Sequence, residues 1–167
     1  MLIQQKIGNL NSHPTNKIID WLTLEWFETN KRILHKKTRS GKEITVKFLK
    51  ENQNLTQEDI IYEDAETIIA IDIHPCEAMV IKPKTMFEMA AVCYEIGNKH
   101  LPSFFQDNEL LIAYEAPLFN FLLLAGYDVI KEKRKLINPL KTSVSSHAHP
   151  GSESLFSKIM KLSTSAE

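Results

Sequence analysis

One stretch is decisive for both the fold and the candidate site, the octet Cys93-Tyr94-Glu95-Ile96-Gly97-Asn98-Lys99-His100. It ends the clearest helix pattern of the chain, whose apolar residues recur at steps of three and four: Met86, Met89, Ala90, Cys93 and Ile96. The pattern predicts a helix over 83–96, with a first-turn proline at Pro83 and a left-handed terminating residue at Gly97. His100 should then lie in the turn past the helix, before Pro102 stops any continuation.

This placement gives His100 two interpretations. An imidazole held beside a rigid element and outside the apolar stripe suits a metal ligand or a proton carrier. A solvated turn histidine is the simpler interpretation, and the spacing taken alone favours it.

The segments around the predicted helix indicate a β-α-β-β-α-β order. Strands are expected at 77–81, 103–105, 110–114 and 129–136, and a second, buried helix at 118–125 that stops at Gly126. This order is the ferredoxin-like arrangement. We assign residues 75–141 to this domain, and the family resemblance described below implies that it binds metal and dimerises.

The N-terminal half has the alternating pattern of short strands. We expect strands at 2–7, 22–28, 33–38, 44–49, 60–62 and 67–71, with a turn at Gly8-Asn9. They predict a small all-β sandwich or barrel over residues 1–74. This domain contains no ligand cluster, so we assign it to partner docking. The fold class is therefore α+β, and the polar residues 142–167 form a flexible C-terminal tail that contains histidines.

Composition excludes several classes of protein. The chain has 167 residues and a formal net charge of −1, without the basic face that a nucleic-acid binder would show. No apolar run is long enough for a membrane span, and Met1 to Lys6 does not resemble a signal peptide. Two cysteines without metal-ligand spacing fit a reducing cytoplasm.

Candidate ligands are His100, His147 and His149. The His147-Ala148-His149 pair lies in the tail, where a mobile chain could wrap both imidazoles around one ion. His13, His35 and His74 match no ligand spacing and are interpreted as surface or strand residues. Cys93 is interpreted as a packed thiol. No nucleophile elbow, zinc-protease motif or phosphate-binding loop is present, so we expect no catalytic residues.

Gly97-Asn98-Lys99-His100 after an apolar helix resembles the Gly-Asn-Arg-His signature of the urease accessory nickel metallochaperone family, UreE. Other segments are similar to that family as well: Trp26 to Arg32, Thr38 to Gly41, and Asp59-Ile60 at a Gly-Asp-hydrophobic turn. The sequence departs from the pattern at Lys99, where the family has arginine, and at Glu58, where it has glycine. The tail has two histidines where some members have a long run, which implies delivery of metal and not high-capacity storage.

The resemblance implies a homodimeric, cytoplasmic metallochaperone that is not an enzyme. It implies that His100 of each subunit binds one Ni²⁺ at the dimer interface, with Zn²⁺ possible at the same site, and that His147 and His149 assist. The implied partners are the urease apoprotein and the urease accessory GTPase complex, with no nucleic acid and no membrane. The alternative is a ferredoxin-like interaction or RNA-binding module without metal, although its central strands would offer only Tyr114 for stacking on bases.

Overall fold

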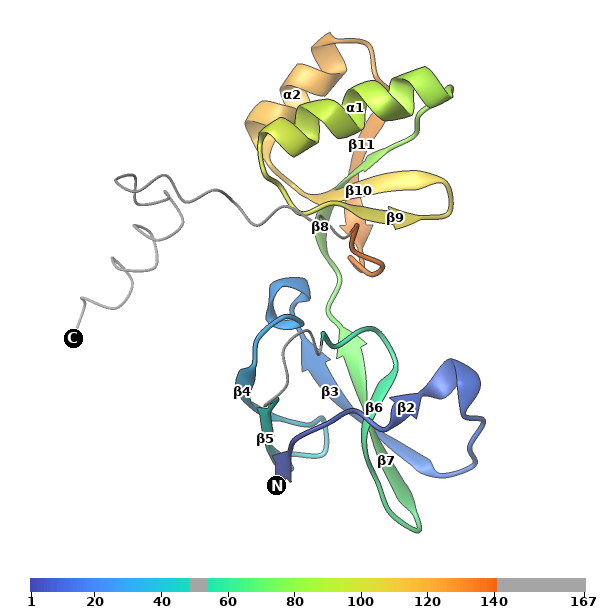
Figure 1. Cartoon of the computed structure of the whole chain (residues 1–167), viewed down its shortest axis with the longest axis vertical. Helices are drawn as coiled ribbons and strands as arrows, with labels where there is room; N and C mark the ends of the chain where they lie inside the picture. Colours follow the sequence, from blue (N-terminus) through green and yellow to red (C-terminus); the bar gives the residue numbers. More distant parts are fainter. Residues whose placement is uncertain (49–53, 141–167) are drawn as a thin grey trace, which may run out of the picture.

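The computed structural model describes residues 1–48 and 54–140, which form two domains stacked along the long axis of the molecule (Figure 1). The N-terminal domain contains β1 (Leu2–Ile3), β2 (Gly8–Asn9), η1 (Leu10–Ser12), β3 (Ile18–Leu24), η2 (Trp26–Glu28), β4 (Ile33–Lys37), β5 (Glu43–Lys47), β6 (Asp59–Glu63) and β7 (Thr67–Ile73). The C-terminal domain contains β8 (Cys76–Ile81), α1 (Met86–Asn98), β9 (Phe104–Gln106), β10 (Glu109–Ala113), α2 (Ala116–Leu124) and β11 (Val129–Arg134).

Two sheets make up the N-terminal domain, with strand orders β1-β5-β4 and β2-β6-β7-β3. Alternate residues of β7 point to opposite faces, so Ile69, Ile71 and Ile73 join the core between the sheets while Ile68 and Ala70 join a smaller cluster outside it. The predicted all-β sandwich is therefore confirmed.

The first predicted strand was wrong in extent. Only Leu2–Ile3 pairs with β5, and Gly8–Asn9, predicted as a turn, pairs with β6 in the other sheet. The chain crosses between the sheets at Gln4 to Lys6. Asp59 stabilises this crossing, because its carboxylate lies 3.1 Å from Lys6 Nζ and 3.2 Å from the side-chain Nδ2 of Asn9.

The predicted strand over 22–28 also ends early. Trp26–Glu28 forms a 3₁₀ turn because the Glu28 carboxylate folds back to accept the backbone N–H of Glu25 at 3.0 Å. Lys36 Nζ lies 2.7 Å from the same carboxylate, which keeps this largely buried acid paired.

The C-terminal sheet has strand order β11-β8-β10-β9, with every neighbouring pair antiparallel. Both helices cover one face of this sheet (Figure 1), and Val92 and Ile96 of α1 share a core with Leu118 and Leu122 of α2. This arrangement confirms the predicted ferredoxin-like fold. Gly126 follows α2 with a φ of 83°, as predicted for its terminating residue.

Helix α1 differs from its prediction at both ends. It begins at Met86 because the Thr85 side chain caps the Glu88 N–H at 3.1 Å. Gly97 lies inside the helix, and the left-handed residue is His100 itself, with a φ of 54°. The Lys99 N–H donates to the carbonyls of Ile96 and Gly97, which extends the helix beyond the predicted end.

The buried stripe of α1 is also rotated from the predicted one. Val92 and Ile96 are fully buried, whereas Met86 and Ala90 are exposed. The sheet lies beneath Val92, so residues on the flank of the predicted stripe face solvent.

The two domains meet over a short junction. Only His74 and Pro75 separate β7 from β8, and the chain after β11 returns alongside β9, where the Leu140 N–H donates to the Ser103 carbonyl at 2.8 Å. The rings of Trp26 and Phe104 meet edge to face across the junction, 5.7 Å apart. No helix in the described ranges combines the length and the apolar character that a membrane crossing requires.

Candidate metal site

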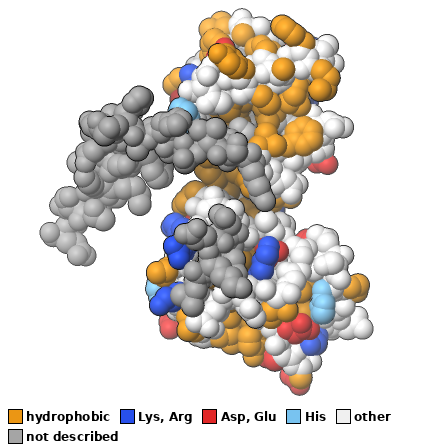
Figure 2. Space-filling model, viewed as in Figure 1, with side chains coloured by type: hydrophobic (Ala, Val, Ile, Leu, Met, Phe, Trp, Pro, Cys, Tyr) orange, Lys and Arg blue, Asp and Glu red, His pale blue; other side chains and the backbone are white. Residues whose placement is uncertain are grey.

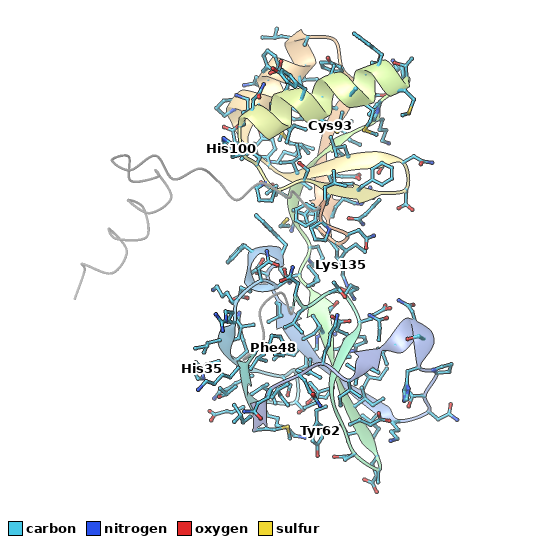
Figure 3. The ribbon with its side chains drawn as sticks, in the orientation of Figure 1. His35, Phe48, Tyr62, Cys93, His100 and Lys135 are labelled. Atoms are coloured by element: carbon cyan, nitrogen blue, oxygen red, sulfur yellow. The ribbon has the colours of Figure 1, made fainter. Side chains whose placement is uncertain are left out.

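His100 stands at the end of α1, at the edge of the C-terminal domain (Figure 3). Its backbone N–H donates to the Gly97 carbonyl at 3.0 Å, which fixes the turn that carries the imidazole. The residue is exposed, and its left-handed backbone is one that histidine adopts more readily than most residues. The local structure therefore holds the ring on a rigid element and directs the chain away from the helix axis.

Within residues 1–48 and 54–140, the His100 ring makes no hydrogen bond and no ion pair with the protein. It therefore keeps a nitrogen lone pair available to a ligand from outside this part of the chain. A neutral imidazole is a good ligand for nickel, zinc and copper.

A complete metal site is not present in the described part of one chain. No group of three His, Cys, Asp or Glu side chains there is arranged to hold an ion. His147 and His149, the other two predicted ligands, lie outside the described residues. His100 is thus placed, and its meeting with the tail histidines remains a prediction.

The remaining histidines have ordinary surroundings. His13 lies 3.4 Å from a Glu63 carboxylate oxygen, and the His35 ring contacts the Thr45 hydroxyl at 3.1 Å in the β4–β5 ladder. His74 sits at the junction, where its backbone N–H donates to the Leu24 carbonyl at 2.8 Å. These positions agree with their interpretation as surface and strand residues.

The cysteines are poor metal ligands in this fold. Both thiols are half-buried, and burial raises the pKa of Cys76 and of Cys93, so the thiolate form that binds metal is disfavoured. The Cys93 sulfur lies 3.8 Å from the Met89 sulfur, within the packing beneath α1. Cys93 is a packed thiol, as predicted.

The two helices carry an exposed apolar surface that was not predicted. We define the helical face as the exposed side chains of Met86, Phe87 and Tyr94 on α1 and of Phe121 and Leu124 on α2. Phe87 is 82% exposed and Leu124 90% exposed, which is unusual for such large apolar groups. Figure 2 shows apolar side chains gathered over this helical layer.

The sequence contained a signal for this face. Helix α2 was predicted to be buried because it is apolar nearly all round, but only Leu118 and Leu122 are buried. A helix that is apolar on both sides, lying on one face of a single sheet, must leave one apolar side uncovered. The uncovered side is therefore an exposed apolar surface of the C-terminal domain.

The opposite face of the C-terminal sheet is not available for binding. Ala78, Val80 and Leu111 on that face are fully buried, and Trp26 of the N-terminal domain packs against their cluster. RNA-binding ferredoxin-like domains stack bases on this face. The junction thus removes the surface that the RNA-binding alternative requires.

The fold and this site define a class: two-domain α+β proteins whose candidate metal ligand is one exposed histidine at the end of a helix, in a domain with an uncovered apolar helical face. Family models agree with both domains, since "UreE urease accessory protein, N-terminal domain" matches residues 3–74 and "UreE urease accessory protein, C-terminal domain" matches residues 77–154. The chain belongs to the UreE family of urease accessory proteins.

Individual relatives agree with this assignment. A urease accessory protein UreE of Flavobacterium johnsoniae is 48% identical over 163 residues, which cover 97% of this chain and 99% of the relative. The UreE protein of Actinobacillus pleuropneumoniae is 40% identical over 147 residues, covering 85% of this chain and 79% of the relative. One from Haemophilus influenzae is 38% identical over 147 residues, covering 85% and 80%.

Proposed function

We propose that this protein is a nickel metallochaperone that binds Ni²⁺ as cargo between two copies of the chain and delivers it for assembly of the urease active site. The observation that carries the proposal is the position of His100, an exposed imidazole at the end of α1 in the domain that carries the uncovered helical face.

The chemistry of the donor set requires a second chain. One imidazole with water is too poor a ligand set to hold a divalent ion firmly. A two-fold axis beside the end of α1 would bring two His100 rings together, because a symmetric dimer uses the same surface of each copy. The same association would cover Phe87 and Tyr94, whose exposure would otherwise favour aggregation.

Such a site suits transfer of metal. Two imidazoles from separate chains leave coordination positions open, and His147 and His149 of the tails can fill them and leave again. Zn²⁺ accepts the same ligands, so it can compete with Ni²⁺ at this position. The protein needs no catalytic group for this task.

The N-terminal domain supplies the docking surface in this proposal. By membership of the family, its partners are the urease apoprotein and the urease accessory GTPase complex, and the protein works in the cytoplasm. Neither nucleic acid nor a membrane takes part.

The test is a calorimetric titration with Ni²⁺ and with Zn²⁺, combined with light scattering for the number of chains. We expect one tight metal ion per dimer, and we expect His100→Ala to abolish that event while the fold is retained, because His100 lies outside the core. His35→Ala is the matched control, since it removes an exposed histidine from the N-terminal domain. If His100→Ala binds Ni²⁺ as the unchanged protein does, the proposed site is wrong.

A further inference from the structure

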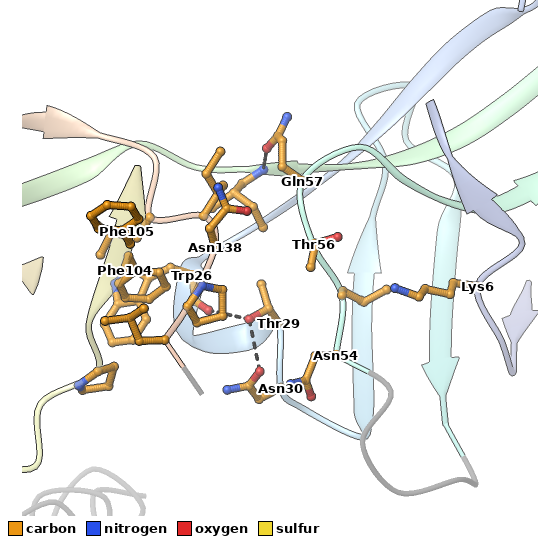
Figure 4. Close-up of a pocket in the computed structure, with 17 residues that line it drawn as sticks. Lys6, Trp26, Thr29, Asn30, Asn54, Thr56, Gln57, Phe104, Phe105 and Asn138 are labelled. Atoms are coloured by element: carbon orange, nitrogen blue, oxygen red, sulfur yellow. Dashed lines mark hydrogen bonds between the residues drawn. The ribbon is translucent and has the colours of Figure 1, made fainter. Parts of the chain in front are cut away.

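A cleft of about 610 Å³ lies between the two domains, and His100 is not among the residues that line it (Figure 4). Figure 4 shows the rings of Trp26, Phe104 and Phe105 on one side and the polar residues Asn54 and Thr56 on the other. The cleft thus has an apolar wall and a polar wall, as a groove for a peptide segment needs.

The apolar wall contains surface that the described chain does not cover. Phe105 is 38% exposed on the edge strand β9, and Leu140 is 46% exposed where the described chain ends. Asn54 and Asn138 both line the cleft, and their side-chain amides make no hydrogen bond within the described ranges. These amides can therefore pair with the backbone of an extended segment.

The chain itself contains a segment of matching chemistry. Residues 141–167 lie outside the described residues, and their sequence is polar except for Leu155-Phe156-Ser157-Lys158-Ile159-Met160. The linker 141–154 starts beside Leu140, which lines the cleft, and an extended chain of its length can span roughly 45 Å. The segment is thus tethered next to the cleft at a high effective concentration, and closing such a loop adds little entropic cost.

We propose that residues 155–160 of each chain fold back and occupy that chain's own interdomain cleft, with Leu155 and Phe156 against the wall formed by Phe104 and Phe105. The docked segment closes a loop over 141–154 that contains His147 and His149. Pro102 lines the same cleft two residues beyond His100, so docking keeps the tail histidines near the first ligand. This last step rests on the proposed function, whereas the docking itself does not.

The test uses the full chain without metal and observes the backbone amides and the Trp26 indole by NMR. Phe156→Asp and truncation after Gly151 should both shift the signals of Trp26, Thr56, Phe105 and Asn138, because both release the segment from the cleft. Ser163→Asp places the same charge in the tail outside the segment and is the matched control, for which we expect no change in these signals. Unchanged cleft signals in the truncated chain would overturn the proposal.

Peptide addition tests the same contact without altering the fold. A peptide of residues 152–167 should restore the original cleft signals when it is added to the truncated chain, and the same peptide with Phe156→Asp should not. Failure of both peptides to move the cleft signals would contradict a specific pocket for this segment.

A spin label distinguishes a chain's own tail from the tail of a second copy. The label is attached at Ser154→Cys in a Cys76→Ser, Cys93→Ser background. It should broaden the cleft signals of the chain that carries it, and not those of an isotope-labelled partner chain mixed with it. Broadening in the partner chain would assign the cleft to a second copy and overturn docking within one chain. Because no metal is present, none of these results depends on nickel binding at His100.

Discussion

Five described non-glycine residues have a positive φ, and two of them, Glu58 and His100, lie at positions where the residue type has a testable consequence. His100 has a φ of 54° at the candidate metal site, and Glu58 has a φ of 66° before β6. Glu58 is fixed on both sides, since its N–H donates to the Ile71 carbonyl at 2.8 Å and its carbonyl accepts the Leu10 N–H at 3.0 Å. The pairing of β6 with its neighbours thus imposes a conformation that glutamate adopts only at a cost.

Glu58→Gly should stabilise the protein. A left-handed conformation costs a residue with a side chain roughly 1–2 kcal/mol, and glycine removes this cost. Part of the stabilisation is offset, because glycine has more conformational entropy to lose on folding. We expect a net increase of about 0.5–1 kcal/mol in the free energy of unfolding, measured with urea. Glu66→Gly is the matched control, because Glu66 is exposed and does not have a positive φ, and this change should destabilise the protein. Equal destabilisation by both changes would show that Glu58 is not strained.

At this scale the sequence predicted the place of His100 but not its conformation. Gly97 was the natural candidate for the left-handed position because it lacks a side chain. The hydrogen bonds of Lys99 decide otherwise, since they continue the helix through Gly97 and leave the reversal to His100. The competition between one more helical turn and an early glycine cap depends on contacts that the local sequence does not contain.

Among the elements, strands with alternating apolar residues were predictable and elements held by side-chain contacts were not. The predicted strands over 33–38 and 44–49 are found as β4 and β5, because their period of two matches a sheet with one buried face. The 3₁₀ turn at Trp26–Glu28 depends on the Glu28 carboxylate and on Lys36, which lies in another element. The apolar pattern of Leu22 to Phe27 does not predict the contact between Glu28 and Lys36.

The helices show a second limit of sequence patterns. An apolar residue on a helix can pack against its own domain or against another molecule, and both give the same sequence signal. Phe121 and Leu124 extend the apolar pattern of α2 but are exposed. Because of this ambiguity, the sequence did not predict the exposed helical face, which serves as the dimer interface in the proposed function.

Phe87→Asp should separate the copies of the chain without unfolding it. Phe87 is 82% exposed on α1, so the change leaves the domain core intact and places a charge in the proposed interface. We expect light scattering or sedimentation to show a shift toward monomer and calorimetry to show loss of the tight Ni²⁺ event, although His100 is unchanged.

The control for that prediction is Ile18→Asp. Ile18 is 72% exposed at the start of β3 in the N-terminal domain, far along the chain from the helical face, and its replacement should preserve the dimer. A Phe87→Asp protein that still dimerises and still binds nickel would place the interface elsewhere.

At the scale of the whole molecule, Asp72 links the two domains. Its carboxylate accepts hydrogen bonds from Arg39 and Gln57 of the N-terminal domain and from Lys135, which follows β11. Burial would raise the pKa of Asp72, but the hydrogen bonds from Lys135 and Gln57 and the charges of Lys135 and Arg39 outweigh it. The pKa is therefore lowered from its ordinary value of 3.8.

A lowered pKa makes this contact sensitive to acid. The stabilisation is complete above the ordinary pKa of the unfolded chain, near 3.8, and it is lost as the pH falls through the lower pKa of the folded protein. Asp72→Asn should therefore reduce the free energy of unfolding at pH 7 by roughly 1.5–3 kcal/mol, the range for hydrogen bonds to charged groups. The difference between the two proteins should shrink below about pH 4.

Urea unfolding at pH 7 and at acid pH measures this effect. Asp64→Asn is a suitable comparison, because the pKa of Asp64 is also lowered, chiefly by hydrogen bonds from the backbone N–H groups of Glu66 and Thr67, which lie in the same turn of the N-terminal domain. If Asp72→Asn leaves stability unchanged at pH 7, the link between the domains contributes nothing measurable.

The short passage from β7 to β8 has a consequence for valency. Since His74 and Pro75 alone separate these strands, the domains extend in line, and the helical face lies at the end of the molecule remote from the N-terminal domain (Figure 1). Two copies joined through that face would carry their N-terminal domains at opposite ends of a long particle. Such a particle is bivalent: it can engage two sites on a multi-subunit partner at once, and it gains avidity only when the spacing of those sites matches its own length.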